Sequence, residues 1–407
     1  MPEQLKTSIR RLGILTGGGD VPGLNPAIKA VVHRADSMGI SVLGLRGGWE
    51  GITFLDRSRG REGVVFRAGD PQTWQHGHVM PLTRLSTNEI DRQGGTILQS
   101  TRTNPANVKV SDLPPHLASY GAGRAPGDKV DLTREVIENM RFLELDGIIV
   151  VGGDDTQSFG ARLVSEGVPA WGIPKTMDND VPGTDYCLGF QTAIERASEF
   201  IGRIRSTGCS HRETILFRIF GRNAGFTALE TAIVASVDRV LIPEVPSNID
   251  RLAELIAADR KNPLQYSTVI LSEGANLGMP VPEEGPADAY GHRKKIDIAE
   301  FLARELSQRL PKVRFLNMDI TYLLRAGEPV VHDRYMGYYY GNLIMNQVQE
   351  KRHGVMAAYR DGQFIVTDIP GKNYPARTVD PADYHPTEYR PNFERITGPY
   401  RPQPVTK

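Results

Sequence analysis

The amino-acid sequence predicts an α/β protein in which largely parallel sheets are covered by helices. Short runs of β-branched and other apolar residues, typical of buried strands, alternate with stretches of helical periodicity. This βαβα order favours parallel strands joined by crossover helices on both faces of a sheet. The chain has 407 residues, more than a single hydrophobic core usually holds, so two or three domains are expected.

The predicted elements follow one another in a regular order. Strands are expected at residues 12–15, 41–45, 147–151, 170–173, 214–219, 240–242 and 268–271. Helices are expected at residues 27–38, 158–166, 192–205, 224–236 and 298–309. Ligands of open parallel sheets bind at the carboxyl ends of the strands, so the functional residues are expected in the loops that follow these strands.

Two segments interrupt this order. Residues 58–127 are rich in Gly, Pro, Arg and Asp, which indicates a long excursion of loops with a few short elements. Residues 372–407 form a proline-rich C-terminal tail, in which long helices and central strands are forbidden. The tail is expected to lie extended along the body or to be partly disordered; an arm that contacts another subunit is the alternative.

Composition excludes several classes of function. The 48 basic and 48 acidic residues give a formal net charge of zero, so nothing global indicates nucleic acid, and an anionic ligand requires a local cluster of charge. Cys187 and Cys209 are too few for a disulfide framework, which fits a reducing compartment. Neither a signal peptide nor a run of about 18 apolar residues occurs, so we expect a cytoplasmic protein that binds no membrane.

The first polar cluster, residues 17–26, lies between a predicted strand and a predicted helix. Its four glycines allow backbone amides to approach an anion, and Asn25 is expected to cap the helix with Pro26 at its first position. The pattern predicts a phosphate cradle. A tight turn that needs glycine only for its conformation is the alternative, and the Walker motif GxxxxGK[ST] is absent.

The second cluster, GGDDT at residues 152–156, also follows a buried strand. Adjacent carboxylates at a strand end are costly unless they meet a cation, and Mg²⁺ prefers a few carboxylates with water and phosphate oxygens. Asp154 and Asp155 therefore indicate a magnesium site. The alternative is a solvated acidic turn in which Asp155 or Thr156 caps the next helix.

The third cluster, PKTMDND at residues 174–180, combines a lysine, a hydroxyl and two carboxylates. In an extended segment residues two apart face the same way, so Asp178 and Asp180 are expected to address one site. Phosphoryl transfer to an alcohol needs a base for the hydroxyl proton, a metal holder and a cation over the phosphates. The cluster predicts that chemistry.

At these clusters the sequence resembles the phosphofructokinase family. LTGGGDVPGLNPAIKAVV resembles the family's opening phosphate loop, GGTILQSTRTNP its second phosphate-contacting loop, VVGGDDT its metal loop and PKTMDNDV its catalytic loop. IFGRNAGFTA resembles the sugar loop, LSEG the strand with the sugar-binding glutamate, and MDITYLLRAGEP the late sugar-phosphate segment. The matching blocks occur in order from about residue 12 to residue 340.

Two positions in this family distinguish the phosphoryl donor. Where ATP-using members typically have a small residue and often a glycine, this chain has Asp155 and Lys175, which resembles pyrophosphate-dependent members. The resemblance implies reversible transfer of a phosphoryl group from pyrophosphate to the 1-hydroxyl of fructose 6-phosphate, in glycolysis or gluconeogenesis. The alternatives are an ATP-dependent member, or one that also acts on sedoheptulose 7-phosphate.

The resemblance also implies a role for each matching residue. The catalytic residues would be Asp178 as the base, Lys175, Thr176 and Arg222. Mg²⁺ would be held by Asp154 and Asp180. Pyrophosphate would be held by Gly18, Gly19, Arg102 and Lys175, with Asp155 selecting the donor. The sugar phosphate would be held by Thr176, Asp178, Asp180, Phe220, Gly221, Arg222, Glu273, Tyr322 and Arg325.

The chain departs from the family pattern at three positions. Phe220 replaces a methionine, which is expected to preserve an apolar contact. Tyr322 stands where many ATP-using members have a histidine, and the string DITYLLRA resembles a pyrophosphate-type variant. Glu213 stands where many members carry an arginine donated across a subunit interface. Because a glutamate cannot bind a phosphate, either the adjacent Arg212 takes over or the sugar-phosphate site is built differently.

Two other classes of protein are disfavoured. A regulatory metabolite-binding module would not need a base beside a metal-binding pair, and a dehydrogenase would need G-x-G-x-x-G in the first loop. The expected fold is two Rossmann-like, three-layer αβα domains with the active site in the cleft between them. Residues 1–188 with a return segment near 325–371 would bind the donor, residues 189–324 the sugar phosphate. The resemblance also implies a homo-oligomer, a dimer or a tetramer.

Overall fold

The computed structural model describes residues 9–284, 294–295, 297–372 and 374–395. The chain divides into two compact units. Unit 1 consists of Met1–Thr176, Val181–Gly189 and Ala326–Pro375, and unit 2 of Met177–Asp180, Phe190–Arg325 and Ala376–Lys407. This division differs from the expected boundaries in that four residues of the third polar cluster and the end of the tail belong to unit 2.

Unit 1 is built on a seven-stranded sheet with the order β15-β14-β7-β6-β1-β2-β3. Its strands are β1 (Arg11–Thr16), β2 (Ser41–Leu45), β3 (Val79–Leu82), β6 (Gly147–Gly152), β7 (Ala170–Pro174), β14 (Val355–Arg360) and β15 (Gln363–Asp368). The five central strands are parallel, and the edge strands β3 and β15 are antiparallel to their neighbours.

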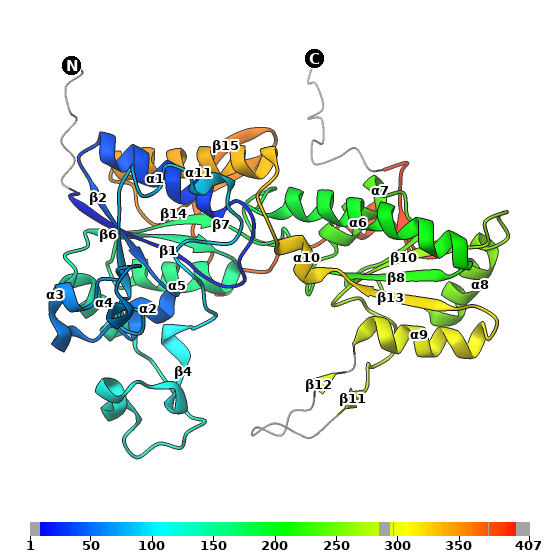
Figure 1. The fold of residues 1–407 in the computed structure, drawn as a ribbon, viewed down its shortest axis with the longest axis horizontal. Coiled ribbons are helices and arrows are strands. Elements are labelled where there is room, and N and C mark those ends of the chain that lie inside the picture. Colours follow the sequence, from blue (N-terminus) through cyan, green and yellow to red (C-terminus); the bar gives the residue numbers. More distant parts are fainter. Residues whose placement is uncertain (1–8, 285–293, 296, 373, 396–407) are drawn as a thin grey trace. The chain divides into compact units, whose positions relative to one another are not determined.

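Helices cover both faces of this sheet (Figure 1). On one face α1 (Leu24–Ser37) packs against α11 (Val331–Gln349), and on the other lie α2 (Trp49–Thr53), α4 (Thr133–Phe142) and α5 (Asp154–Ser165). The core on the second face joins Ile148 and Val150 of β6 to Phe159 of α5, and the Phe159 ring meets the Trp49 ring edge-on at 4.7 Å.

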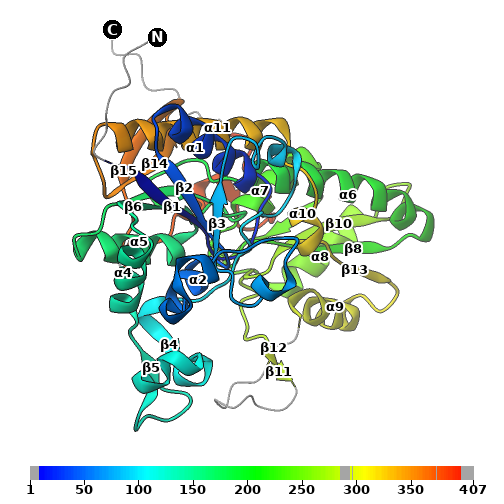
Figure 2. The same ribbon diagram turned by 60° about the vertical axis from the view of Figure 1, so that its left-hand side comes forward.

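The excursion after β2 consists of short elements, as expected. They include α3 (Gly60–Gly63) and a two-stranded ribbon of β4 (Val108–Lys109) and β5 (Lys129–Val130), which extends away from the sheet of unit 1 (Figure 2). The sequence did not predict β3, which contains Pro81. A proline is tolerated there because β3 is the last strand of this sheet, and the bridge of its outer edge to Val65 is made by Val79, two residues before the proline.

Unit 2 contains a four-stranded parallel sheet with the order β13-β8-β10-β9. Its strands are β8 (Thr214–Ile219), β9 (Arg239–Leu241), β10 (Ser267–Ser272) and β13 (Phe315–Asp319). Its helices are α6 (Phe190–His211), α7 (Phe226–Val234), α8 (Ile249–Asp259), α9 (Ile298–Arg309) and α10 (Thr321–Arg325). Both units are therefore layered α/β structures, which confirms the predicted class.

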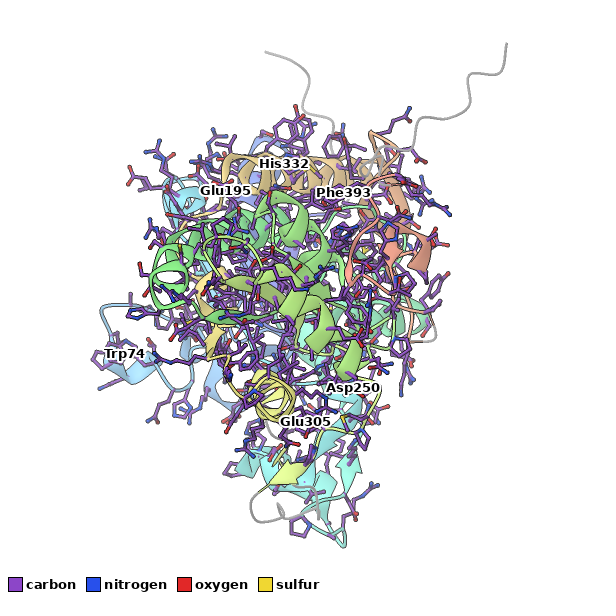
Figure 3. The ribbon with its side chains drawn as sticks, turned by 90° about the vertical axis from the view of Figure 1, so that its right-hand side faces the viewer. Trp74, Glu195, Asp250, Glu305, His332 and Phe393 are labelled. Carbon is purple, nitrogen blue, oxygen red and sulfur yellow. The ribbon has the colours of Figure 1, made fainter. Side chains whose placement is uncertain are left out.

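In unit 2, α6 and α7 pack together on one face of the sheet, while α8 and α9 pack together on the other (Figure 1). Arg309 of α9 joins the two helices of the second face, because it pairs with Asp250 of α8 at 2.5 Å and with Glu305 of its own helix at 2.8 Å. Figure 3 labels both carboxylates. No helix in the described ranges is long and apolar enough to cross a membrane.

The described end of the tail is folded against unit 2. The strands β16 (Tyr384–His385) and β17 (Arg390–Pro391) form a small antiparallel ribbon beside β9. The Tyr384 hydroxyl donates to the Val240 carbonyl at 2.8 Å, and the Val240 amide donates to the Tyr389 carbonyl at 2.7 Å. The described part of the tail from Ala376 to Arg395 thus lies against unit 2 and includes a short ribbon.

Candidate functional site

Three polar loops meet at one edge of the sheet of unit 1. They follow β1, β6 and β7, which are adjacent parallel strands and therefore end at the same edge. Lys175 connects two of the loops. Its ammonium group is buried and donates to the Gly19 carbonyl at 2.5 Å, while its backbone amide donates to the Gly152 carbonyl at 3.1 Å. The lysine of the third cluster thus lies against the loop of the first.

The loop after β1 requires glycine at two positions. Gly18 has a left-handed φ of 82°, and a Cβ atom on Gly17 would lie 2.5 Å from a side-chain carbon of Thr156. The Gly18 amide donates to the Thr101 carbonyl at 2.9 Å, and the Ser100 hydroxyl donates to the Gly18 carbonyl at 2.6 Å. Gly18 therefore holds residues 100–101 beside the loop after β1, and its own amide is already used within the protein.

The expected cap of α1 is wrong. The helix begins at Leu24, with Gly23 as its N-cap and no side-chain cap. Asn25 is buried inside the first turn, where its amide nitrogen donates to the Gln93 carbonyl at 3.1 Å and its oxygen accepts from the Ile97 amide at 3.0 Å. A buried amide side chain needs such partners, so Asn25 ties the segment before Arg102 to α1.

Asp154 and Asp155 lie in the first turn of α5, and both are exposed. Gly153 is the N-cap and no side chain caps this helix, so the alternative in which Asp155 or Thr156 is the cap is not observed. Asp154 accepts a hydrogen bond from the Asp155 amide at 2.8 Å. The positive end of the helix dipole stabilises carboxylates at this position.

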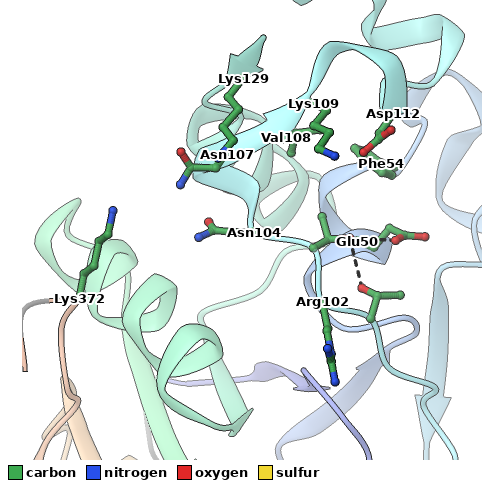
Figure 4. Close-up of a pocket in the computed structure, with 12 residues that line it drawn as sticks. Glu50, Phe54, Arg102, Asn104, Asn107, Val108, Lys109, Asp112, Lys129 and Lys372 are labelled. Carbon is green, nitrogen blue, oxygen red and sulfur yellow. Dashed lines mark hydrogen bonds between the residues drawn. The ribbon is translucent and has the colours of Figure 1, made fainter. Parts of the chain in front are cut away.

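A pocket of about 780 Å³ opens in unit 1 next to residues 101–104 (Figure 4). Four cations and two carboxylates are among the side chains that line it: Arg102, Lys109, Lys129, Lys372, Glu50 and Asp112. The sequence predicted only Arg102, because the other five come from separate segments without a common motif. The pocket is larger than pyrophosphate requires.

In unit 2, the predicted sugar-binding residues follow three neighbouring strands. Arg222 follows β8, Glu273 follows β10, and Arg325 ends the short helix after β13. The Arg222 Nε atom lies 4.0 Å from a Glu273 oxygen, and the Arg325 guanidinium lies 4.5 Å from the centre of the Phe220 ring. The carboxyl edge of this sheet therefore gathers residues that lie up to about a hundred positions apart.

Tyr322 and Gly221 complete this set. The Tyr322 side chain is 80% exposed, with its ring centre 6.0 Å from the Arg325 guanidinium. Gly221 has a φ of 126°, and a Cβ atom there would lie 2.7 Å from the Ala224 carbonyl oxygen. The β8 loop thus turns sharply and presents Arg222, whose side chain is 71% exposed.

Residues 177–180, called the 177–180 loop below, belong to unit 2. The Arg222 amide donates to the Asp178 carboxylate at 3.1 Å, and the Thr227 hydroxyl donates to the Met177 carbonyl at 2.5 Å. The expectation of an extended segment is wrong, because Asn179 has a left-handed φ of 55°. Asparagine tolerates this conformation better than most residues.

The pKa of Asp178 is raised to about 7. Burial is the main cause, and the negative charges of Asp180 and Glu273 add to it, whereas the Arg222 amide and the Arg325 charge oppose it. Asp178 and Asp180 therefore interact although the loop is turned. A carboxylate with a pKa near neutrality suits a general base at cellular pH.

The raised pKa predicts a pH-dependent stability change in Asp178→Asn. In the unfolded chain the carboxyl ionises near pH 3.9, so between about pH 4 and pH 7 the folded wild type binds the extra proton and loses stability as pH rises. Asparagine carries no such penalty. Above pH 7 the free energy of unfolding of the variant is expected to exceed that of wild type by up to about 4 kcal/mol. This value is an upper limit, because the conversion of the pKa rise at about 1.36 kcal/mol per pH unit assumes that the folded protein does not relax around the charge. Urea unfolding in EDTA at pH 5 and pH 8 measures this, and a difference that does not widen with pH would contradict it.

Glu213 is held within its own chain. Its carboxylate is largely buried and lies 3.2 Å from the guanidinium of Arg314. Arg212 has a left-handed φ of 52°, and its side chain is exposed. Glu213 therefore has an internal partner, and Arg212 is the residue beside it that remains at the surface.

Comparison with known proteins bears on this arrangement. A family model described as Phosphofructokinase matches residues 11–348. The chain is 33% identical over 377 residues to the pyrophosphate–fructose 6-phosphate 1-phosphotransferase of Dictyoglomus thermophilum, covering 92% of this chain and 96% of that protein. It is 31% identical over 381 residues to the ATP-dependent 6-phosphofructokinase 3 of Streptomyces coelicolor, covering 93% and 99%. Relatives with either donor name are thus similar to about the same degree.

The fold is similar to the crystal structure of a pyrophosphate-dependent phosphofructokinase from Nitrosospira multiformis. The TM-score is 0.70 with 15% sequence identity, and the match covers 94% of this chain and 89% of that one. At this identity the similarity concerns the fold alone.

Proposed function

Because the chain belongs to the phosphofructokinase family, whose members are phosphotransferases with an alcohol group as acceptor, we propose that it transfers a phosphoryl group from pyrophosphate to the 1-hydroxyl of fructose 6-phosphate. The products are fructose 1,6-bisphosphate and phosphate, and the reaction is reversible. One observation carries the choice of donor: the buried Lys175 ammonium lies against the 17–19 loop, where its charge compensates a compact anion that has no nucleoside to anchor it.

Unit 1 would bind the donor. Gly19, Arg102 and Lys175 would contact pyrophosphate, while Gly18 would shape the loop. Asp155, exposed in the first turn of α5, would repel the additional phosphate of a nucleotide. Lys175 and Arg102 would stabilise the charge that the phosphoryl group carries during transfer.

Unit 2 would bind the acceptor. Asp178 would accept the proton of the sugar 1-hydroxyl, with Thr176 of unit 1 hydrogen-bonding nearby. Arg222 and Glu273 would orient the sugar beside Phe220 and Gly221. Tyr322 and Arg325 would bind the 6-phosphate, which a guanidinium recognises well through paired N–H donors.

Asp154 and Asp180 would hold Mg²⁺. No group of three or more His, Cys, Asp or Glu side chains suited to a metal gathers within the described residues. Mg²⁺ does not require such a group, because it usually takes one or two carboxylates and completes its shell with water and substrate phosphates. The exposed Asp154 carboxylate fits that mode, and bound Mg²⁺ would neutralise part of the phosphate charge.

A second candidate is ATP-dependent phosphorylation of the same acceptor. The pocket of about 780 Å³ beside Arg102 favours it, because this space exceeds what pyrophosphate fills and Phe54 and Val108 supply an apolar part of its wall. Asp155 and Lys175 argue against it.

A coupled assay with Mg²⁺ and fructose 6-phosphate tests the proposal. We expect kcat/KM to be at least 100-fold higher with pyrophosphate than with ATP. A preference for ATP would contradict the proposed donor and leave the proposed acceptor in place. Activity with sedoheptulose 7-phosphate but not with fructose 6-phosphate would contradict the proposed acceptor. Inactivity with both donors would overturn the proposal as a whole.

A further inference from the structure

The C-terminal tail returns to the 177–180 loop through Arg377. The Arg377 amide donates to the Asp180 carbonyl at 2.8 Å, and its guanidinium Nη1 donates to the Asn179 carbonyl at 3.3 Å. One residue near the end of the chain thus holds two consecutive carbonyl groups of a loop that lies 198 positions earlier. Arg377 and the 177–180 loop both belong to unit 2.

The Arg377 guanidinium is itself held by α7. Its central carbon lies 4.4 Å from the centre of the Phe226 ring, which is a cation–π contact. Glu230, one turn further along α7, is partly buried, and the charge of Arg377 partly offsets the rise in the pKa of Glu230 that burial causes. The guanidinium therefore fills a defined place between α7 and the loop.

The same helix holds the other end of the loop. Thr227 of α7 donates to the Met177 carbonyl, so Met177 is fixed by the helix, and Asn179 and Asp180 by the tail. Asp178 lies between these anchors and accepts from the Arg222 amide. The direction of the Asp178 carboxylate thus depends on the loop being held on both sides.

The tail is anchored directly after Arg377. The Val379 amide donates to Oε1 of Glu244 at 2.9 Å, and the same oxygen accepts from the amide of Gly225, the N-cap of α7, at 2.9 Å. Arg377 therefore cannot shift along the loop without breaking the contact between the tail and the start of α7.

We propose that Arg377 is a positioning residue that keeps the 177–180 loop in its left-handed turn, and that the tail thereby helps to orient Asp178, the proposed base. The proposal rests on the proposed function in that Asp178 acts as the base. Asparagine tolerates the left-handed conformation better than most residues, but the conformation still costs free energy, so contacts around the loop help to hold Asn179 in it. Without the guanidinium the loop loses the hydrogen bond from Arg377 to the Asn179 carbonyl and samples other turns, so fewer molecules present Asp178 correctly.

Kinetics of three variants of the full chain test this assignment. Arg377→Ala is expected to lower kcat 10-fold to 100-fold while KM for the donor stays within about twofold, because the donor residues lie in unit 1. Arg377→Lys, which keeps the charge over Phe226 and one donor, is expected to recover at least a third of the wild-type kcat. Arg395→Ala, an exposed arginine of the same tail, serves as the control and should stay within twofold.

Hydrogen–deuterium exchange gives a readout that does not depend on activity. Exchange in a peptide covering residues 177–180 is expected to accelerate at least 10-fold in Arg377→Ala and to remain unchanged in Arg395→Ala, with exchange in β8 and β10 as the measure of overall folding. Unchanged kcat or unchanged exchange of the loop in Arg377→Ala would overturn the proposal, as would equal acceleration throughout unit 2. If wild type is inactive with both donors, the proposed function fails, and the exchange experiment still decides whether Arg377 holds the loop.

Discussion

Replacement of Asp178 by asparagine is expected to lower the turnover number at least 100-fold. General base catalysis contributes typically 100-fold to 10,000-fold, and an amide cannot accept the proton of the sugar hydroxyl. Asparagine keeps the shape of the side chain, and its oxygen can still accept from the Arg222 amide, so the loop and the ligand contacts are preserved. The loss should therefore fall on kcat, with KM for both substrates within a few-fold of wild type.

Steady-state kinetics with each substrate varied in turn measure this effect. Asp250→Asn is the matched control, because Asp250 is an exposed aspartate of the same unit whose partner is Arg309 on α9. The control is expected to retain the wild-type kcat. A normal kcat in Asp178→Asn would exclude Asp178 as the base.

Removal of the Asp155 carboxylate is expected to raise ATP-dependent activity. A carboxylate about 4 Å from a phosphate charge costs about 4 kcal/mol at an effective dielectric near 20, and screening at this exposed side chain reduces the cost to about 1 to 2 kcal/mol. That range corresponds to roughly a 5-fold to 30-fold gain in kcat/KM for ATP. Asp155→Gly removes both bulk and charge, whereas Asp155→Asn removes only the charge.

The double variant Asp155→Gly/Lys175→Gly should lose pyrophosphate use as well. Lys175 supplies the charge that compensates pyrophosphate, and its ammonium also holds the Gly19 carbonyl. The measurement is kcat/KM for both donors in wild type and in the variants, at fixed Mg²⁺ and saturating fructose 6-phosphate. If wild type already prefers ATP, or if Asp155→Gly leaves the donor ratio unchanged, Asp155 does not select the donor.

Much of the fold was predictable because the central strands are short, continuous runs of apolar and β-branched residues, which are typical of buried parallel strands. The strands β1, β2, β6, β7, β8, β9 and β10 lie where the sequence places them, within a residue at either end. Helix α11 was missed because it carries Gly337 and Gly341, which are unfavourable in an isolated helix. In the structure these glycines allow close packing on α1, since a Cβ atom on Gly341 would lie 2.7 Å from that of Ala30.

The candidate site was predictable where its residues are contiguous. Glycines, a lysine or paired aspartates directly after a buried strand indicate anion and metal chemistry without knowledge of the neighbouring strands. The geometry within these motifs was less predictable, because Asn25 and Asn179 adopt their observed roles only through partners outside the motif.

The sequence by itself therefore determined the α/β class, the order of the polar loops and the residue types suited to phosphoryl transfer, since each depends on short-range pattern. Only the tertiary structure decided that Lys175 bonds to Gly19, that the pKa of Asp178 rises to about 7, and that Arg377 holds the 177–180 loop. These features depend on burial and on contacts between residues far apart in the chain. Local propensity and periodicity carry no information about either.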